Sequence, residues 1–152
     1  MRRESQRIDV HHHVIPPVFS QAMQRQGLTE VAGAPLPAWS PRHSLEIMDM
    51  QGIQTALLSL SAPGVHLGGG VQDAVSLAQA CNDHCAELVQ AHPGRFGFFG
   101  VLPMPFTEPA CREAVRALDV LGADGIVLLG STDGYFLGDG RFEPLMAELD
   151  RR

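Results

Sequence analysis

The sequence lacks the short motifs that identify several common enzyme classes. It contains no Gly-x-Ser-x-Gly nucleophile elbow, no Walker phosphate loop and no Gly-x-Gly-x-x-Gly turn, so serine hydrolases, nucleoside triphosphatases and dinucleotide-binding enzymes have no support. The 152 residues carry a formal net charge of -6, and the isoelectric point is near 5.5. Because no basic stripe is present to follow a phosphate backbone, we expect no nucleic-acid partner.

Long apolar runs are absent and cysteine is scarce. The longest apolar run is far shorter than the roughly 20 residues that span a bilayer, so we expect no membrane association. The first ten residues are charged and no apolar stretch follows them, so they are not expected to form a signal peptide. The three cysteines, Cys81, Cys85 and Cys111, are widely spread and odd in number, which favours reduced thiols in a cytoplasmic protein.

Two hydrophobic periods alternate along the whole chain. Apolar runs predict four strands, at residues 8–10, 53–60, 96–102 and 125–129. Apolar residues spaced by three and four predict helices over 41–51, about 72–91 and 108–121, with a last helix beginning near residue 142. The polar, proline-rich residues 14–40 are expected to form an irregular excursion between the first strand and the first helix.

The resulting β-α-β-α-β-α-β-α order predicts an α/β fold with a parallel sheet. An open doubly wound sheet and a (β/α)8 TIM barrel both fit this order. Four units are half of such a barrel, which usually needs about 250 residues. We therefore expect residues 1–152 to form a single, incomplete barrel domain that stops before strand five. Unpaired edge strands and an uncovered apolar face should promote association.

The most specific motif is a run of three histidines, His11, His12 and His13, directly after the apolar residues 8–10. Side chains alternate between the two faces of a strand, so His11 and His13 should share one face and His12 should occupy the other. Two imidazoles on one face can hold one divalent cation, although a catalytic zinc site needs three protein ligands. The run predicts part of a metal site; a fortuitous run of histidines is the alternative.

Candidate substrate-binding residues lie where the predicted strands end. Pro63, Gly64 and His66 follow the second strand, at the end where barrel active sites form. Trp39, the only tryptophan, lies in the excursion and could offer an aromatic face to a planar ligand. The structural alternatives are a flexible loop for Pro63 and Gly64, a solvent-facing histidine at His66 and a packing role for Trp39.

Two further segments have weaker claims to bind ligands. The glycines at residues 68–70 precede a helix, whose free N–H groups attract anions. The sequence Cys81-Asn82-Asp83-His84-Cys85 superficially resembles a metal knuckle. Helical spacing places both of its cysteines on the apolar stripe, so we interpret them as core residues.

Several segments together resemble the amidohydrolase superfamily, in the branch that contains aminocarboxymuconate-semialdehyde decarboxylase and methylsalicylate-type decarboxylases. These segments are RIDVHHHVIPP, PAWSPRHSLEIMDMQGIQTALLSLSAPGV, CNDHCAELVQAHPGRFGFFGVLPMP and DGIVLLGSTDGYFLGDGRFEPLMAELDRR. The His-x-His pair is shared widely across that superfamily, whereas the PGV and RFG motifs are more specific to this branch. The residues YFLGD differ slightly from the usual motif of the branch at this position.

The resemblance implies a metal-dependent (β/α)8 barrel in which His11 and His13 bind a divalent ion, with zinc as the expected metal. It also implies that the catalytic residues, on strands five, six and eight, lie beyond Arg152. The expected activity of the full-length homo-oligomer is decarboxylation of a small aromatic or unsaturated carboxylic acid. A hydrolase acting on a lactone or an amide is the alternative, as is a catalytically silent chain. We expect the 152-residue chain alone to bind zinc weakly and to have little turnover.

Overall fold

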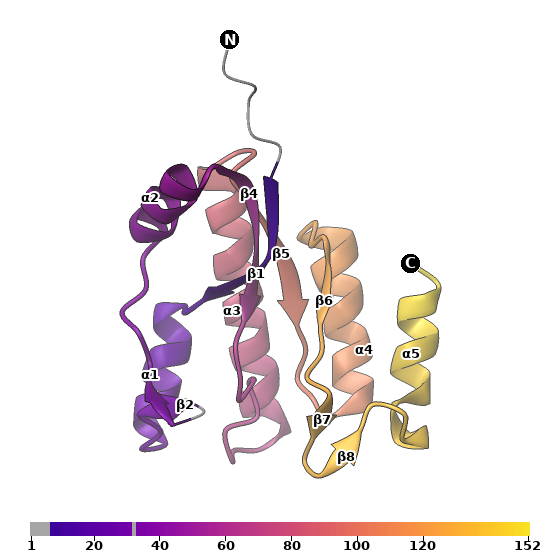
Figure 1. Ribbon diagram of the computed structural model, residues 1–152. Helices are drawn as coiled ribbons and strands as arrows, with labels where there is room; N and C mark the ends of the chain where they lie inside the picture. Colours follow the sequence, from indigo (N-terminus) through magenta and orange to yellow (C-terminus); the bar gives the residue numbers. More distant parts are fainter. Residues whose placement is uncertain (1–6, 32) are drawn as a thin grey trace.

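The computed structural model describes residues 7–31 and 33–152, and its centre is a four-stranded parallel sheet (Figure 1). The strands are β1 (Arg7–Val14), β4 (Ile53–Leu60), β5 (Phe96–Val101) and β6 (Gly125–Val127). Their order in the sheet is β1-β4-β5-β6, so each strand lies beside the one that precedes it along the chain. This arrangement confirms the predicted α/β fold with half the strands of a (β/α)8 barrel.

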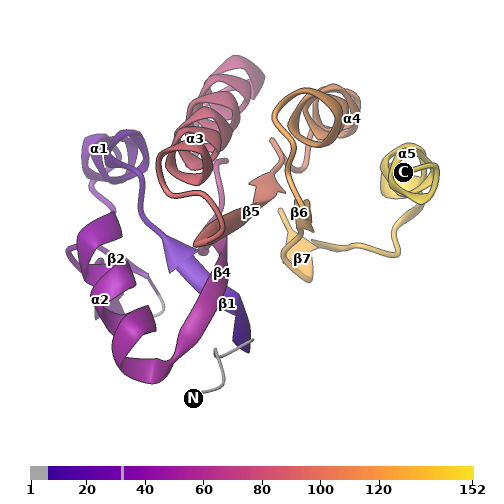
Figure 2. The same ribbon diagram turned by 90° about the horizontal axis from the view of Figure 1, so that it is seen from above.

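The helices connect and cover these strands. They are α1 (Pro17–Arg25), α2 (Pro41–Gln51), α3 (Val71–Ala91), α4 (Thr107–Val115) and α5 (Glu143–Asp150). A π-helical turn over Arg116–Val120 continues α4, and a 3-10 turn over Gly140–Phe142 leads into α5. Viewed from above, α1, α3 and α4 lie along one side of the curved sheet, and the opposite side is open (Figure 2).

Two short hairpins lie at the end of the molecule toward which the strands run (Figure 1). One pairs β2 (Glu30–Val31) with β3 (Ala34–Pro35), and the other pairs β7 (Ser131–Thr132) with β8 (Tyr135–Phe136). The loops that follow β4 and β5 are at this end too. In parallel α/β folds, ligands bind at the carboxyl ends of the strands.

The expectation of an irregular excursion over residues 14–40 is wrong for its first part, which contains α1. Proline occupies the first turn of α1, where its fixed φ suits a helix and its missing N–H costs nothing. Phe19, Ala22 and Met23 are buried on the inner face, which is the three- and four-residue spacing of an amphipathic helix. Pro16 and Pro17 at the start of the helix obscured this short apolar pattern in the sequence.

The first strand is longer than the predicted residues 8–10, because it runs from Arg7 to Val14. All three histidines therefore lie within the strand and not after it. The predicted helix over 41–51 is confirmed with both boundaries. Ser40 caps its start by accepting a hydrogen bond from the His43 N–H at 3.2 Å, and Gly52 ends it with a φ of 63°.

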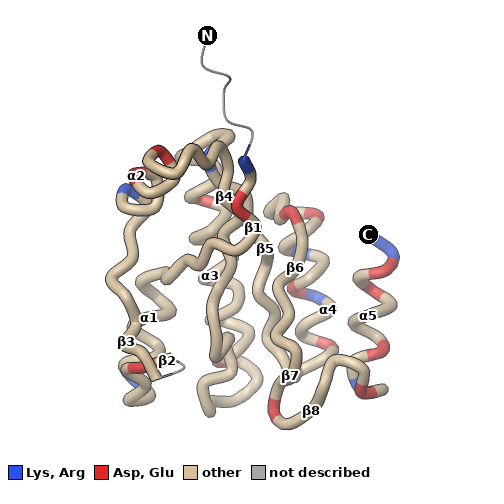
Figure 3. Tube along the Cα trace, viewed as in Figure 1, with Lys and Arg blue, Asp and Glu red and all other residues tan. Residues whose placement is uncertain are grey.

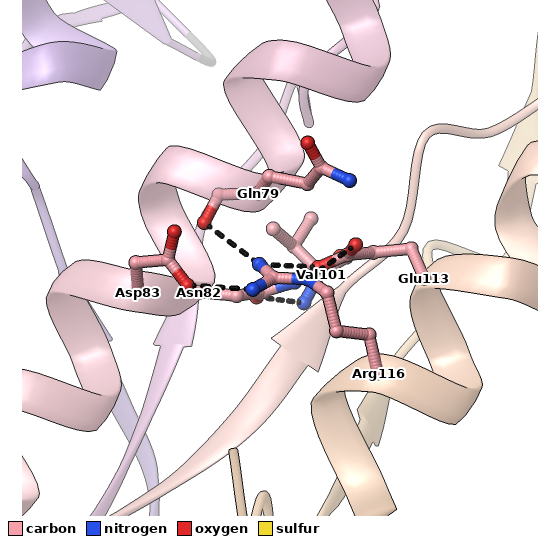
Figure 4. A network of polar contacts seen from close by, with 6 residues as sticks. All are labelled: Gln79, Asn82, Asp83, Val101, Glu113 and Arg116. Carbon is pink, nitrogen blue, oxygen red and sulfur yellow. Dashed lines mark hydrogen bonds and ion pairs between the residues drawn. The ribbon is translucent and has the colours of Figure 1, made fainter. Parts of the chain in front are cut away.

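A buried polar network joins α3, β5 and α4 (Figure 4). The Asn82 amide donates to the Val101 carbonyl at 2.9 Å and to the Glu113 carboxylate at 2.7 Å, and its oxygen accepts from the Val101 N–H at 2.8 Å. Asn82 is 1% exposed and Glu113 is 2% exposed. Arg116 completes the network, because its guanidinium donates to Glu113 at 3.0 Å and to Asp83 at 2.8 Å. The network satisfies the side chains of Asn82 and Glu113, which are buried between α3, α4 and the sheet.

Cys81 and Cys85 are buried on α3 and form no disulfide, as the helical spacing predicted. Burial raises the pKa of the Cys85 thiol to about 12. Burial, together with the neighbouring Cys85, also raises the pKa of Cys81. Across residues 7–31 and 33–152, no group of three or more His, Cys, Asp or Glu side chains could hold a metal ion. No helix in the same residues is long and apolar enough to cross a membrane.

We expect the substitution Asn82→Ala to lower the free energy of unfolding by about 2–4 kcal/mol, because it strands two backbone groups and a carboxylate without partners in the interior. Urea denaturation followed by circular dichroism measures the change. The matched control is Gln72→Ala on the exposed side of α3, which should change stability by less than about 0.5 kcal/mol. Equal effects of the two substitutions would contradict the role of the network.

We also expect Cys81 and Cys85 to resist a colorimetric thiol reagent at pH 8. A thiol whose pKa is about 12 is ionised to only about one part in ten thousand at that pH. The native protein should therefore react at half-buried Cys111 alone, and all three thiols should react in denaturant. Rapid labelling of three thiols in the native state would disprove the buried placement.

Candidate metal centre

His11 and His13 converge on the open side of β1. Their Nε2 atoms lie 3.1 Å apart, their ring centroids are 4.9 Å apart and their ring planes meet at 79°. Alternate residues of a strand are about 6.7 Å apart along the backbone, so the two rings lean toward each other. The structure thus brings together the two residues that the sequence predicted to share a face.

A one-residue bulge in β1 accompanies this convergence. Asp9 pairs with Ala56 and His12 pairs with Leu58, so three steps along β1 correspond to two steps along β4. Bulges bend a strand and re-aim its side chains, and they are frequent beside active sites. The His11 N–H inside the bulge donates to Oδ1 of Asp9 at 3.1 Å. The extra residue is therefore stabilised by a side chain of its own strand.

The neighbouring strand fixes the tautomer of His13. Its Nδ1 lies 3.3 Å from the carbonyl oxygen of Ser59 and 3.4 Å from the Ser59 hydroxyl. A carbonyl oxygen only accepts, so Nδ1 carries the proton and donates it to Ser59. The lone pair of the His13 Nε2 then faces His11. Metal-binding histidines are commonly oriented in this way by a carbonyl on the second nitrogen.

His12 points to the opposite side of β1, as the alternation predicted. Its Nδ1 donates to Oδ2 of Asp9 at 3.1 Å, and its Nε2 lies 3.0 Å from the hydroxyl of Ser44 on α2. Burial by itself would raise the pKa of Asp9, but hydrogen bonds from His11 and His12 outweigh burial and hold that pKa below its ordinary value. Asp9 is thus held as a carboxylate within the bulge.

The geometry of the pair fits a divalent cation. At zinc–nitrogen bonds of about 2.0–2.1 Å, two ligand nitrogens are about 3.3–3.4 Å apart in a tetrahedral site and about 2.8–3.0 Å apart in an octahedral one. The observed 3.1 Å lies between these values and suits both geometries. Two lone pairs at this distance repel unless a proton or a cation lies between them, so the pair can hold a cation in place of a proton.

An apolar depression lies beside the pair. It has a volume of about 530 Å³ and is lined by both histidines, by the end of β4, by Phe99 and by residues 126–129. The three strands β4, β5 and β6 carry no charged residue, and Figure 3 shows the charges on the helices, the loops and the strands β1 and β2. The histidine pair, Ser59 and Ser61 are therefore the polar side chains of an otherwise apolar wall.

Three of the predicted substrate-binding residues gather next to this depression. Pro63, Gly64 and His66 line a second cavity, of about 380 Å³, with the end of β6 and part of the β7–β8 hairpin. Residues 127–129 line both cavities, so the two spaces share a wall. His66 is also held in place, because its Nε2 lies 3.2 Å from the Gly69 carbonyl and its ring packs edge-on against Phe106.

The structure places Trp39 elsewhere. Its side chain packs against the hydrophobic cluster that contains Val14, Met48 and Phe98, and its indole Nε1 is buried with no hydrogen-bond partner among the described residues. The N-terminus of α3 at residues 68–70 already holds an anionic group, because the Gly70 N–H donates to the Asp73 carboxylate at 3.0 Å. A substrate role for Trp39 stays a prediction, and the placement gives it no direct support.

Sequence reasoning did not find the contacts that Asp9, Ser44 and Ser59 make with the histidines. Asp9 is two residues before His11, so its closeness to the histidines in the sequence could have indicated a contact with them. Ser44 and Ser59 come from α2 and β4, and 32 and 46 residues separate them from their histidine partners. No local pattern in the sequence marks these two serines.

Comparison with known proteins shows similarity over almost the whole chain, including both histidines. A family model described as Amidohydrolase matches residues 8–152. The chain is 44% identical over 151 residues to decarboxylase yanB of Aspergillus niger, covering 96% of this chain and 41% of the relative. It is 36% identical over 150 residues to 6-methylsalicylic acid decarboxylase of Penicillium expansum, covering 96% of this chain and 46% of the relative. The chain thus spans less than half the length of these relatives.

Solved structures give the same picture. A structure described as amidohydrolase II superposes with a TM-score of 0.92 at 32% identity, covering 97% of this chain and 48% of that one. The 5-carboxyvanillate decarboxylase of Sphingomonas paucimobilis gives 0.83 at 25% identity, with 97% and 49% covered. A dihydroxybenzoic acid decarboxylase of a Polaromonas species, with bound manganese and 2-nitroresorcinol, gives 0.78 at 25% identity, with 97% and 47% covered.

The family match extends over both histidines and all four strands of the parallel sheet, and it agrees with the structural superpositions. The chain therefore belongs to the amidohydrolase family.

Proposed function

We propose that this chain supplies the histidine half of the metal site of a decarboxylase that acts on a small aromatic carboxylic acid. One observation carries the proposal: the Nε2 atoms of His11 and His13 converge to 3.1 Å while Ser59 holds the other nitrogen of His13. The similarity to proteins named as decarboxylases of aromatic acids supports the substrate class.

His11 and His13 would hold the cation, which we propose to be divalent. Zinc is the metal that the resemblance implies, and manganese is the metal in the Polaromonas relative; the spacing of the pair suits either. When bound, such an ion supplies a Lewis acid that polarises oxygen atoms of the substrate. Two imidazoles leave coordination positions for the substrate and for further protein ligands, which come from outside the described residues.

The other residues of the depression have binding and exclusion roles in this proposal. The walls at Phe99 and residues 126–129 would pack against the faces of an aromatic ring and keep water away from it. The carboxylate and an adjacent hydroxyl of the substrate would then face the histidine pair. Pro63, Gly64 and His66 would line the neighbouring space for ring substituents.

The reaction needs no oxidant or reductant. The bond between the ring carbon and the carboxylate carbon breaks, CO₂ leaves, and the electron pair stays on the ring carbon, which takes up a proton. An apolar wall favours loss of a charged carboxylate because the product CO₂ is neutral. We assign the proton donor to none of the described residues, and the placement of the catalytic residues beyond Arg152 stays a prediction.

We also propose that the working enzyme is a cytoplasmic homo-oligomer. Three free thiols support a reducing compartment. Ile8 and Val10 on the outer strand β1 are 63% and 61% exposed, and Phe136 on β8 is 76% exposed. Exposed apolar side chains on the outer strand and on the β7–β8 hairpin favour contact with another protein surface, which we propose to be a second copy of the protein.

We expect metal binding to depend on the histidine pair. The substitutions His11→Ala and His13→Ala should each lower the affinity of the chain for Zn²⁺ or Mn²⁺ by at least about tenfold, because each removes one of two ligands. Isothermal titration calorimetry measures the affinity. The control is His43→Ala on α2, whose side chain is 65% exposed and which should bind like the original chain. Equal affinity in all four proteins would refute the site.

We expect decarboxylation only when the second half of the barrel is present. The 152-residue chain should release little CO₂ from hydroxybenzoic acids such as 6-methylsalicylate. A chimera in which residues 8–152 replace the aligned part of the Penicillium expansum enzyme should release CO₂, and His13→Ala in that chimera should reduce the rate by at least about 100-fold.

The His43→Ala chimera is the control and should keep its rate. A folded chimera that binds metal but releases no CO₂ would contradict the proposal. If that chimera opened a lactone instead, the hydrolase alternative would be favoured.

A further inference from the structure

We infer that Asp9, His12 and Ser44 form a positioning relay, which stabilises the bulge of β1 and thereby sets the separation of the His11 and His13 Nε2 atoms. None of these three residues belongs to the pair itself. The inference rests on the proposed function for the identity of the pair as metal ligands. Its structural part, the control of the bulge, can be tested without any metal.

Asp9 uses both carboxylate oxygens inside the bulge. Its Oδ1 accepts from the His11 N–H at 3.1 Å, and its Oδ2 accepts from the His12 ring at 3.1 Å. One carboxylate therefore contacts two consecutive residues of the bulged segment. Because the partners are the backbone of His11 and the side chain of His12, the relative orientation of the two residues is restrained.

His12 connects this carboxylate to the helical layer. A carboxylate only accepts, so the His12 Nδ1 carries a proton, and in the neutral ring Nε2 accepts a hydrogen bond from the Ser44 hydroxyl at 3.0 Å. Ser44 lies in the first turns of α2 and is 4% exposed, and the side chain of His12 is 14% exposed. The bulge is thus anchored to a buried position on α2.

The anchor matters because a bulge can migrate along a strand. If the extra residue moved by one position, the side chains between the old and new positions would exchange faces. His11 would then leave the open side of β1, while His13 would stay bonded to Ser59. Asp9 opposes this exchange because its carboxylate binds the His11 N–H and the His12 ring at once, which ties His11 to its place in the bulge while Ser44 holds His12 on the helical side.

The alternative is that the three residues contribute only to general stability. The two roles differ in their observable effects. A purely stabilising relay lowers the free energy of unfolding and leaves the geometry of the folded pair intact. A positioning relay changes the register of β1 against β4 and the affinity for a cation, even where the protein remains folded.

The decisive variants are Asp9→Ala and Ser44→Ala. Ser44→Thr is the conservative variant, because it keeps the hydroxyl that contacts His12. The matched control is Asp49→Ala, which removes a carboxylate that is 68% exposed and paired with Arg95. Zn²⁺ affinity is measured by calorimetry, the site is followed by the visible absorption of bound Co²⁺, and urea denaturation reports stability.

We expect Asp9→Ala to lower Zn²⁺ affinity by about 10- to 100-fold, the range found for residues that orient metal ligands, and to change the Co²⁺ spectrum. Ser44→Ala should have a smaller effect in the same direction, and Ser44→Thr should restore the original affinity. Asp49→Ala should leave both the affinity and the spectrum unchanged. Unchanged affinity in Asp9→Ala, or losses that follow stability equally in Asp9→Ala and Asp49→Ala, would overturn the inference.

Nuclear magnetic resonance of the metal-free chain separates this inference from the proposed function. Contacts of Asp9 with Ala56 and of His12 with Leu58 report the bulge, and ring ¹⁵N shifts report the His12 tautomer. We expect Asp9→Ala to lose these contacts and Asp49→Ala to keep them. If Asp9→Ala keeps the same register, the relay is refuted whatever the metal affinity. If the original chain binds no cation but the register changes as expected, only the proposed function fails.

Discussion

The pairing of β1 with β4 is the constraint on which the rest of the site depends. The two strands run in parallel, and one extra residue of β1 lies between the pairs Asp9 with Ala56 and His12 with Leu58. This offset directs His12 toward α2 and leaves His11 and His13 on the open side of the sheet. The same pairing brings the Ser59 carbonyl to the second nitrogen of His13. The convergence of the two histidines and the orientation of the His13 ring thus have one structural origin.

The two faces of the sheet around this pair differ in the polar groups that they carry. On the side of α3 and α4, the Asn82 side chain bonds to both backbone polar groups of Val101, which ties the end of β5 to α3 (Figure 4). On the open side, β4, β5 and β6 present uncharged residues around two imidazoles. A cation bound there would interact with few competing charges, which strengthens its effect on a substrate oxygen in an apolar setting.

The open side also fits the proposal that this chain supplies half of a metal site. Four parallel strands curve but do not close, and a (β/α)8 barrel places ligands from strands on both sides of its interior. The described residues offer two convergent nitrogens and no third metal-binding side chain near them. The relatives are more than twice as long as the region they share with this chain. Further ligands and a proton donor from opposite strands fit this geometry.

Local sequence patterns determined most of the secondary structure. The helix over 41–51 could be predicted because Ser40 and Gly52 mark its ends, and the strand over 53–60 because its apolar run is continuous. The buried placement of Cys81 and Cys85 followed from helical spacing. The helix over 17–25 was missed because a nine-residue apolar stripe after two prolines is too short to stand out from an irregular loop. The shared face of His11 and His13 followed from the alternation of side chains in any strand.

Only the tertiary structure decided how those two histidines are aimed. The bulge depends on the register between β1 and β4, and the contacts with Ser44 and Ser59 join residues 32 and 46 positions apart. The packing of Trp39 into a hydrophobic cluster is equally non-local. Hydrophobic periodicity and turn residues are local patterns of a few neighbouring positions. The register between strands and the orientation of the histidine rings arise only when distant segments pack together. The sequence by itself therefore specified that His11 and His13 share one face of a strand, and the tertiary structure specified how closely their Nε2 atoms approach.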